Sequence, residues 1–331
     1  MSVSKQIGWL IIGLIALIGA SCAHALVGET AVSFSTMMEA IFQYDRSVID
    51  HVLFREFRLC RTLTAILAGS SLALSGMLMQ TLFNNPLAGP YILGINSGAS
   101  LFVGLLLMSG ISIGGAQLGI VGAALLGAFV SCIFMIGLSG YLRNQISLLL
   151  AGMMFGSFTS AILSILQQMS GAEALKAFTM WSMGTLQQVS FEELSIFASA
   201  VSAGVVLALV MGKFLNVLVL GEKPARLLGV NIVRTRVIIL MAVAILAGVT
   251  TAFCGPIAFV GMAVPNLTRL IFKTQQHHLL IGMNLLFGAL FVLICDTLIL
   301  HWSTVLPIPL NAFTSLIGAP FVLLILMRRV R

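Results

Sequence analysis

The sequence predicts an all-α polytopic membrane protein with about ten transmembrane helices and an inverted internal repeat. Of its 331 residues, 59% are hydrophobic and only 8% are charged. Because the water-facing surface of a soluble domain is mostly polar, a mean hydropathy of +1.11 excludes a soluble globular protein of this size. Apolar runs reach the roughly 20 residues that cross a bilayer as a helix, and such unbroken runs exclude a membrane β-barrel.

We expect a single transmembrane domain over residues 1–331, with the apolar runs as its spans. The expected spans are 7–27, 62–82, 91–109, 114–138, 146–169, 195–218, 237–254, 256–272, 279–300 and 312–327. The first run is interpreted as a retained helix, because Cys22-Ala23-His24 is a poor cleavage context for a signal peptide. The five cysteines form no CxxC pair, so we expect small buried side chains and no disulfide framework.

The distribution of charge predicts how the chain is oriented in the membrane. An even number of spans places both termini on one side, and the positive-inside rule identifies that side as cytoplasmic. In this orientation the 17 Lys and Arg residues divide into twelve inside and five outside, whereas eight of the ten acidic residues lie outside. The net charge of +7 therefore reflects the orientation of the chain in the lipid membrane and not an affinity for nucleic acid.

One segment of the chain recurs. The stretch AILAGSSLALSG (65–76) resembles AILAGVTTAFCG (244–255) at an offset of 179 residues, and eight of the 22 positions from 65 to 86 are identical to their counterparts. The two copies begin the second and seventh spans, so they cross the membrane in opposite directions, as in the inverted repeats of transporters. We place the repeat halves at 62–169 (helices 2–5) and 237–327 (helices 7–10); chance recurrence of Ala, Gly and Leu is the alternative.

Charge is concentrated between the sixth and seventh spans, at about 219–236, in the stretch LGEKPARLLGVNIVRTR (220–236). Pro224 suits the first turn of a short helix, and the glycine five residues later can end it in a left-handed conformation. The acidic residue just before Pro224 favours the positive end of the helix dipole. We expect a surface helix with charged edges and an exposed Leu-Leu tip that docks a cytoplasmic partner, formed by Glu222, Lys223, Arg226, Leu227, Leu228 and Gly229.

Two further stretches lie at opposite ends of the second span. At its outer mouth, Arg58 and Arg61 are three residues apart and share a helical face. Arginines on the outer side run against the orientation rule, which favours an acidic extracytoplasmic partner over simple snorkelling. After the second span, the stretch NNPLAGPYILGINSGAS (84–100) contains two prolines and three glycines, which fits either a tight turn or part of a gate.

The spans contain little that could carry out chemistry. There is no HExxH, GxSxG, Walker lysine or pair of carboxylates, so we expect no enzymatic activity, no metal site and no cofactor. Asp296, the one acid inside a span, is expected to pair with a neighbouring helix; a proton relay is the alternative. His24 is expected to pack against a carbonyl, and His277 and His278 to be solvated. Because a charged relay is missing, another protein is expected to supply the energy for any transport.

In this order, the segments resemble the FecCD family of ATP-binding-cassette (ABC) importer permeases over nearly the whole chain. The similar stretches are RLCRTLTAILAGSSLALSGMLMQTLFNNPLAGPYILGINSGAS (58–100), LLLAGMMFGS (148–157), MWSMGTL (180–186), LGEKPARLLGV (220–230), GPIAFVGMAVPNLTRL (255–270) and LIGAPFVLLILMRR (316–329). The resemblance implies ten helices per subunit and two permease subunits, expected to be a homodimer, around a central pathway. It also implies a cytoplasmic ABC ATPase dimer and a periplasmic substrate-binding protein.

The same resemblance implies roles for particular residues. Residues 222–230, the coupling segment, correspond to the part that sits in a groove of the ATPase. The residues implied to dock the binding protein are Arg58, Arg61 and His301, and those implied to lie near the inner gate are Asn85, Leu87, Gln145 and Ile146.

Departures from the family pattern fall mostly on the outer side. Cys60 stands where the family has a proline between the two arginines, and Asn266 replaces a histidine after Pro265. Leu300 replaces an arginine beside His301, and VLPIPLN (305–311, including Pro307 and Asn311) replaces a glutamate-leucine-proline-x-glycine pattern. These changes bear on binding-protein docking, whereas the coupling segment is closer to the family pattern.

The sequence therefore predicts an inner-membrane permease subunit that imports an iron chelate, a siderophore or haem, from the periplasm. Cobalamin is the alternative cargo, and the choice of chelate is left open, as is a homodimer against a heterodimer. An ion-coupled secondary carrier that uses Asp296 and His24 is the alternative mechanism. A membrane scaffold without transport activity is the third interpretation.

Overall fold

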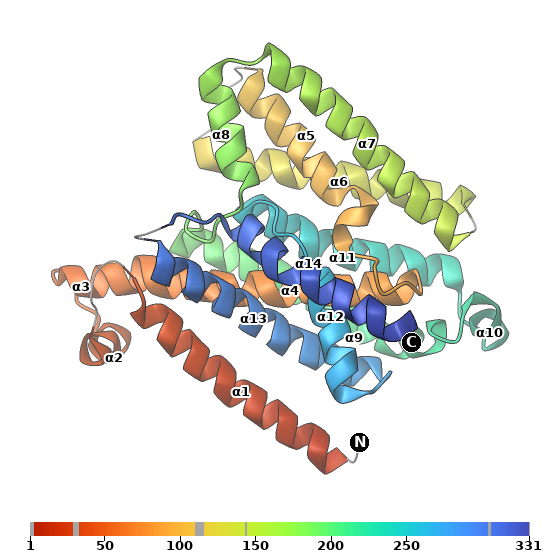
Figure 1. The fold of residues 1–331 in the computed structure, drawn as a ribbon, viewed down its shortest axis with the longest axis horizontal. Helices are drawn as coiled ribbons and strands as arrows, with labels where there is room; N and C mark the ends of the chain where they lie inside the picture. The colour runs from red at the N-terminus through yellow and green to blue at the C-terminus, as the bar shows by residue number, and fades with distance from the viewer. Residues whose placement is uncertain (1–2, 29–32, 110–115, 143, 304–305, 331) are drawn as a thin grey trace.

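The computed structural model describes residues 3–28, 33–109, 116–142, 144–303 and 306–330, and within them the regular structure is entirely helical (Figure 1). The helices are α1 (Val3–Leu26), α2 (Phe34–Phe42), α3 (Ile49–Val52), the π-helix η1 (Leu53–Leu59), α4 (Cys60–Leu82), the 3₁₀ turn η2 (Pro90–Leu93), α5 (Ile95–Met108), α6 (Ala116–Tyr141), α7 (Gln145–Met169), α8 (Ala172–Ser182), α9 (Phe191–Leu218), α10 (Glu222–Leu227), α11 (Ile232–Cys254), α12 (Val260–Phe272), α13 (His277–Trp302) and α14 (Leu310–Val330). The all-α prediction is confirmed for these residues.

The helices fall into two groups by their capacity to cross a membrane. Those long and apolar enough are seven in the described residues: Gly8–Leu26, Ile49–Leu82, Leu118–Tyr141, Gln145–Met169, Phe191–Leu218, Ile232–Cys254 and His277–Trp302. Shorter apolar helices, Ile95–Met108, Val260–Phe272 and Leu310–Leu324, coincide with the remaining three expected spans. The chain is therefore a multi-pass membrane protein, while the count of ten crossings stays a prediction. The expected span 114–138 begins outside the described residues.

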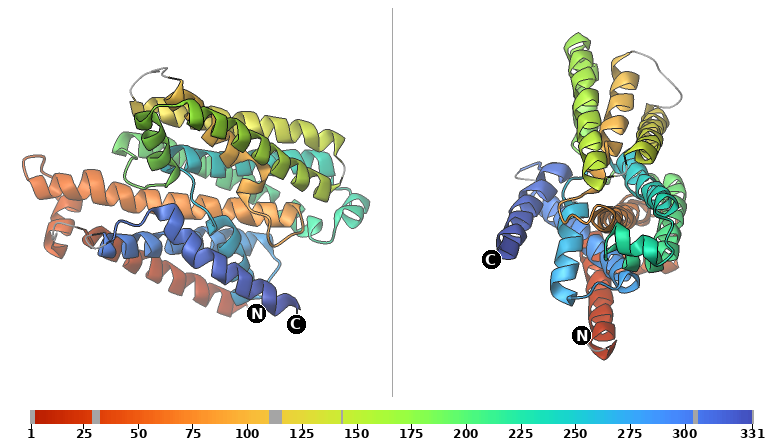
Figure 2. Two further views of the ribbon diagram at one scale, coloured as in Figure 1. Left: turned by 45° about the horizontal axis from the view of Figure 1, so that its top comes forward. Right: turned by 90° about the vertical axis from the view of Figure 1, so that its right-hand side faces the viewer.

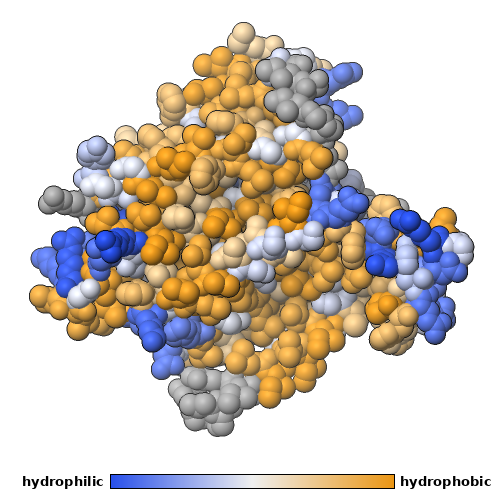
Figure 3. Space-filling model, turned by 180° about the vertical axis from the view of Figure 1, so that it is seen from behind, coloured by the Kyte–Doolittle hydropathy of each residue, from blue (hydrophilic) through white to orange (hydrophobic). Residues whose placement is uncertain are grey.

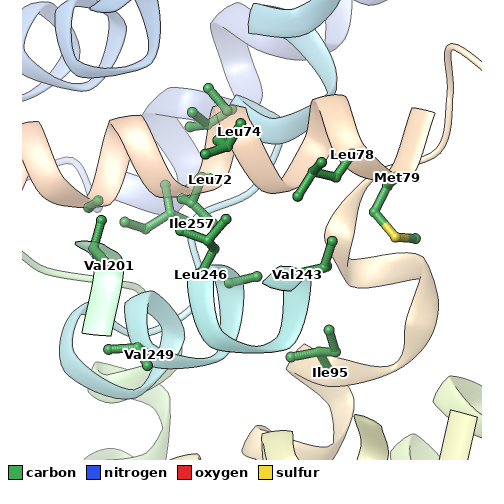
Figure 4. Close-up of a cluster of buried hydrophobic side chains, with 14 of the residues drawn as sticks. Leu72, Leu74, Leu78, Met79, Ile95, Val201, Val243, Leu246, Val249 and Ile257 are labelled. Atoms are coloured by element: carbon green, nitrogen blue, oxygen red, sulfur yellow. The ribbon is translucent and has the colours of Figure 1, made fainter. Parts of the chain in front are cut away.

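Helices α4 and α11 form the centre of the molecule. The buried share of the most apolar stretch is 83% in the span Ile49–Leu82 and 72% in Ile232–Cys254. The same share is only 17% in Gly8–Leu26 and in Gln145–Met169. Branched and long apolar side chains from both helices interdigitate, and Leu72 and Leu246 lie together between α4 and α11 (Figure 4). In a bilayer, where lipid is as apolar as the core, close packing of this kind holds helices together.

Each of the two central helices packs against helices of the other expected repeat half. Helix α4 packs against α12 and α13 of the second half, and α11 packs against α5 and α6 of the first half. The hydroxyls of Ser71 and Thr250, separated by the 179-residue offset of the repeat, lie 2.5 Å apart where α4 meets α11. Reciprocal packing of this kind is what an inverted repeat predicts, and the repeat itself stays a prediction.

Glycines allow the closest of these contacts. A Cβ atom added to Gly69 of α4 would lie 2.1 Å from the carbonyl oxygen of Gly288 in α13, and one added to Gly288 would lie 2.3 Å from that of Gly69. No side chain fits at such distances. The small residues that the sequence shows in α4 therefore serve helix approach, as expected for membrane helices.

Polar groups collect at the two ends of the molecule, and an apolar belt separates them (Figure 3). Helix α10 lies at one end together with the N-terminal part of α1 and the C-terminal part of α14, whereas α2 and α3 lie at the opposite end (Figures 1 and 2). We call these the α10 end and the α3 end. Which of them faces the cytoplasm stays a prediction.

The expected second span is longer than predicted. Its helix begins at Ile49 and runs through a π-helical segment into α4, for 34 residues. At about 1.5 Å per residue it is longer than the ~30 Å hydrocarbon core of a bilayer, so its first turns extend past the membrane. Arg58 and Arg61 lie on this extended part, on a helix as predicted.

Candidate functional site

The coupling segment folds as a short capped helix at the α10 end. It enters through Gly221, whose φ of 100° only glycine adopts readily, and its acidic first residue lies at the positive end of the helix. It ends in a Schellman motif, in which the N–H of Val230 donates to the carbonyl of Ala225 (3.0 Å) and the N–H of Gly229 to that of Arg226 (3.0 Å). Gly229 has a φ of 82°, as the sequence predicted.

The exposed face of this helix is apolar at its tip. Leu227 is 89% exposed and Leu228 is 64% exposed, with the cationic side chains of Lys223 and Arg226 also exposed beside them. Ala225 is buried against the body of the protein. Two adjacent leucines that project from a polar end, outside the apolar belt, form a surface suited to a protein partner.

A partly buried ion pair anchors the other side of the helix. The Nη2 of Arg236, in the first turn of α11, donates to the Oε1 of Glu222 at 2.7 Å. The same oxygen accepts from the Nε2 of Gln145, the first residue of α7, at 3.2 Å. Gln145, expected at the gate, and Glu222, expected at the ATPase, therefore meet directly.

The other expected gate residues lie in two separate places, the turn after α4 and the start of α7. Asn85 Oδ1 accepts from the N–H of Leu87 (2.9 Å) in the turn after α4, where Asn266 Nδ2 donates to the carbonyl of Pro86 (2.8 Å). Ile146 is 67% exposed at the start of α7. The stretch 84–100 is thus a turn, the 3₁₀ segment η2 and the first residues of α5, and the expected span 91–109 is α-helical only from Ile95. A gating role for these residues stays a prediction.

The α3 end contains a buried ionic cluster that joins α1, α4 and α13. Arg61 donates from Nε and Nη2 to the two carboxylate oxygens of Asp296, at 2.7 and 2.8 Å. Asp296 also lies 2.8 Å from His24 Nε2, and the Nδ1 of that histidine lies 2.8 Å from the Oγ1 of Thr62. The pairing expected of Asp296 is confirmed. The expectation that His24 packs against a carbonyl is wrong, because its ring nitrogens meet side-chain oxygens.

The expected docking residues of the α3 end differ in what they can reach. Arg61 has its guanidinium engaged by Asp296, and Arg58 donates to the carbonyls of Ala25 and Leu26 at 3.3 and 3.1 Å. His301 is exposed in the last turn of α13. The internal bonds of the two arginines hold the N-terminal end of α4 against α1 and α13. Docking by any of the three residues stays a prediction.

A second buried polar cluster, at the α10 end, was not anticipated. His277 is completely buried; its Nε2 lies 2.9 Å from Thr81 Oγ1 and its Nδ1 lies 2.9 Å from Asn216 Oδ1. Arg269 donates to Gln80 and to Thr81 (3.4 Å). The expectation of a solvated His277–His278 pair is wrong for His277, whereas His278 is exposed. The cluster joins α4, α9, α12 and α13.

A half-open hollow lies beside α7, with a volume of about 570 Å³. Hydroxyl groups and glycines line it, including Tyr91, Ser97, Gly156, Ser157 and Ser160. Ser157, Ser160 and Ser164 repeat at the spacing of one helical face and are all exposed. Ser157 and Ser164 donate to the carbonyls of Met153 and Ser160, one turn earlier, so their hydroxyls are satisfied within the helix. This face of α7 therefore combines small hydroxyl side chains with the apolar side chain of Met153.

Comparison with known proteins gives consistent matches over most of the chain. A family model described as the FecCD transport family matches residues 14–328. The hemin transport system permease protein HmuU of Yersinia pestis is 34% identical over 332 residues, which cover 98% of this chain and 96% of that protein. The cobalamin import system permease protein BtuC of Halobacterium salinarum is 32% identical, over 84% of this chain and 74% of that protein.

A solved structure matches the fold equally well. It belongs to a transporter assigned to the metal-chelate type of ABC transporter, in an inward-facing conformation. It superposes with a TM-score of 0.86 at 28% identity, over 97% of this chain and 99% of the solved chain.

Proposed function

The chain belongs to the FecCD transport family, and from that premise we propose that it is the permease subunit of an ABC importer for an iron chelate. Siderophores and haem are the proposed cargo class, and cobalamin is the second candidate. A hemin permease and a cobalamin permease are both similar to it over most of their length, which supports the class without separating its members.

In this proposal the α10 end faces the cytoplasm and the α3 end faces the periplasm of the bacterial inner membrane, with both termini cytoplasmic. Two copies enclose the pathway, and the hydroxyl-lined hollow beside α7 forms part of its wall. This wall combines Ser, Tyr and Gly with Ile92 and Met153 and has no fixed charge, so a bulky chelate is neither trapped nor excluded by its net charge.

A separate cytoplasmic ATPase dimer drives transport in this proposal. The observation that supports this is the exposed Leu227–Leu228 tip of α10. We propose that the tip inserts in an apolar groove of the ATPase, with Lys223 and Arg226 beside it. Closure of the ATPase on ATP moves α10, and the packed helices follow as rigid bodies between outward and inward openings. The permease itself catalyses no reaction.

The test of this docking is Leu228→Asp. A charge buried in an apolar groove is strongly unfavourable, so we expect the ATPase to dissociate and uptake of haem to fall by about a hundredfold or more. The variant chain should still accumulate in the membrane, because Leu228 makes no core contact. Copurification of the ATPase with the permease measures docking. Uptake of haem and of ferric citrate into vesicles measures transport. Uptake equal to that of the unmodified chain rules out the docking role.

At the α3 end we propose that a periplasmic binding protein docks near Arg58, Arg61 and His301. His301 is the exposed member of the set, and the cluster of Arg61, Asp296 and His24 holds the surface in shape beneath it.

The alternative is an ion-coupled carrier, for which the His24–Asp296 contact at 2.8 Å is the supporting observation. Arg61 donates to both carboxylate oxygens of Asp296, which argues for a structural pair and against a proton relay. Uptake that continues when a protonophore is added at constant ATP supports the ATPase-driven importer; uptake that stops supports the carrier.

A further inference from the structure

We propose that Arg236, Glu222 and Gln145 form a mechanical link that carries movement of the coupling helix α10 to the first turn of α7. The proposal rests on the function proposed above, because it requires an ATPase that moves α10. It gives Arg236 a positioning role between the docking surface and the pathway.

Arg236 holds two elements with one rigid guanidinium. Its Nη2 donates to Glu222 Oε1 at 2.7 Å, and its Nη1 donates to the carbonyls of Ser139 and Leu142 at 3.2 Å each. Arg236 is only 4% exposed. Because an arginine fork fixes the direction of its bonds, the first residue of α10 is held in register with the C-terminal end of α6.

Gln145 extends this connection to α7. Its Nε2 donates to the same Glu222 oxygen at 3.2 Å, and the adjacent Asn144 caps the helix by accepting from the N–H of Ile146 at 3.0 Å. One carboxylate oxygen therefore joins the starts of α7, α10 and α11. A helix is rigid along its axis, so a displacement of its capped first turn moves the exposed serine face further along it.

The position of the ion pair favours a link over simple stabilisation of the loop. Arg236 is buried and Glu222 is partly buried, and removing charges from water is unfavourable, so such pairs contribute little net stability and are best attested as devices that fix register. The nearby Arg234, on the same helix, is exposed, and its backbone N–H is bound by the Asn231 side chain at 3.1 Å. Helix α7 is also among the least buried spans, so few other contacts fix its position.

The experiment uses the intact complex of permease, ATPase and binding protein in proteoliposomes, with an Ile146→Cys reporter in a Cys22→Ser background. Cys22 is replaced because it is partly exposed and could react with the maleimide, whereas the other four cysteines are buried. The rate of maleimide labelling at position 146 is measured with and without ATP and vanadate, and uptake of haem and of ferric citrate is measured per ATP hydrolysed. Arg236→Met removes the link, and Gln145→Ala breaks only the bond to α7. Lys213→Met, an exposed cation of α9, is the matched control.

In the parent complex and in Lys213→Met we expect ATP and vanadate to change the labelling rate. In Arg236→Met and Gln145→Ala the ATPase should stay bound and hydrolyse ATP, while the labelling rate no longer responds and uptake per ATP falls by about tenfold. If Arg236→Met does not fold, Gln145→Ala decides alone, because it removes one hydrogen bond at a partly exposed position.

Three results overturn the link, and they are distinguishable. A response in Gln145→Ala equal to that of Lys213→Met rejects the link while leaving ATPase docking intact. A parent complex that binds the ATPase but whose position 146 ignores ATP also rejects only the link. A parent complex that binds no ATPase rejects the proposed function and the link together.

Discussion

At the scale of single residues, charge inside this protein is paired across long distances in the sequence. Arg61 and Asp296 are 235 residues apart, yet two short bonds join them, and His24 approaches the same carboxylate from α1. Each ion alone would be strongly unfavourable in this buried position. The cluster therefore fixes where α1, α4 and α13 meet, and the loss of one member should be more harmful than the loss of the whole set.

Asp296→Asn tests this expectation. The substitution leaves the Arg61 guanidinium buried without a counter-ion, so we expect a loss of about 3–5 kcal/mol in stability, the usual effect of breaking a buried pair. The loss should appear as a lower midpoint of thermal unfolding in detergent.

Asp50→Asn serves as the control, because Asp50 is an exposed acid at the same end of the molecule. It should change the unfolding midpoint little. The double substitution Arg61→Met with Asp296→Leu removes both charges and should recover most of the lost stability. Equal destabilisation by the single and double changes contradicts the ionic account.

The shape of the coupling helix could be predicted from the sequence, and its ionic anchor could not. Pro224 and Gly229 act on the backbone beside them, so their effect is visible in a short stretch of sequence. Glu222 meets Arg236 and Gln145 through the fold, and no local pattern indicates that contact. The only available signal was an arginine placed next to a long apolar run, which also fits the orientation rule. His24 was misjudged for the same reason.

At the scale of elements, glycines determine how closely the helices pack. Gly69→Ala places a methyl group 2.1 Å from the Gly288 carbonyl oxygen, so α4 and α13 must separate. We expect a loss of about 1–3 kcal/mol, typical of overpacking in a tight interior. The measurement is the unfolding midpoint together with the fraction that elutes as a single species from a gel-filtration column.

The matched control is Gly122→Ala on α6, where an added Cβ meets no atom within 4 Å. There the higher helix propensity of alanine should leave stability unchanged or raise it by about 0.5–1 kcal/mol. A similar loss from both substitutions means that the loss does not depend on the close contact between α4 and α13, and the close-contact explanation is then wrong.

Most element positions could be predicted because apolar runs mark the bilayer directly. The beginning of the helix that contains α4 could not, because its charged stretch from Arg55 to Arg61 does not match an apolar span. Hydropathy ignores helices that continue past the membrane. The short helix α12 likewise begins four residues later than expected, at Val260, after a segment that is not helical.

At the scale of the whole molecule, α4 and α11 form an axis between two groups of helices. Each packs against members of the other expected half, and Ser71 and Thr250 meet between them. Residues related by a two-fold axis come together only near that axis, so this contact supports the inverted repeat. A permease built in this way can tilt its two groups about a central pair without breaking the core.

The orientation of this assembly gives the last prediction. The twelve-to-five excess of cationic residues on one side predicts that the α10 end is cytoplasmic. In a Cys22→Ser background, a membrane-impermeant maleimide should label Asp50→Cys in right-side-out vesicles and Leu227→Cys only in inverted vesicles. Both positions are exposed, so both cysteines should react once detergent has dissolved the membrane. This reaction is the control for access of the maleimide. The reverse pattern would place the leucine tip outside the cell, where no ATPase could bind it, and the proposed function would fail with it.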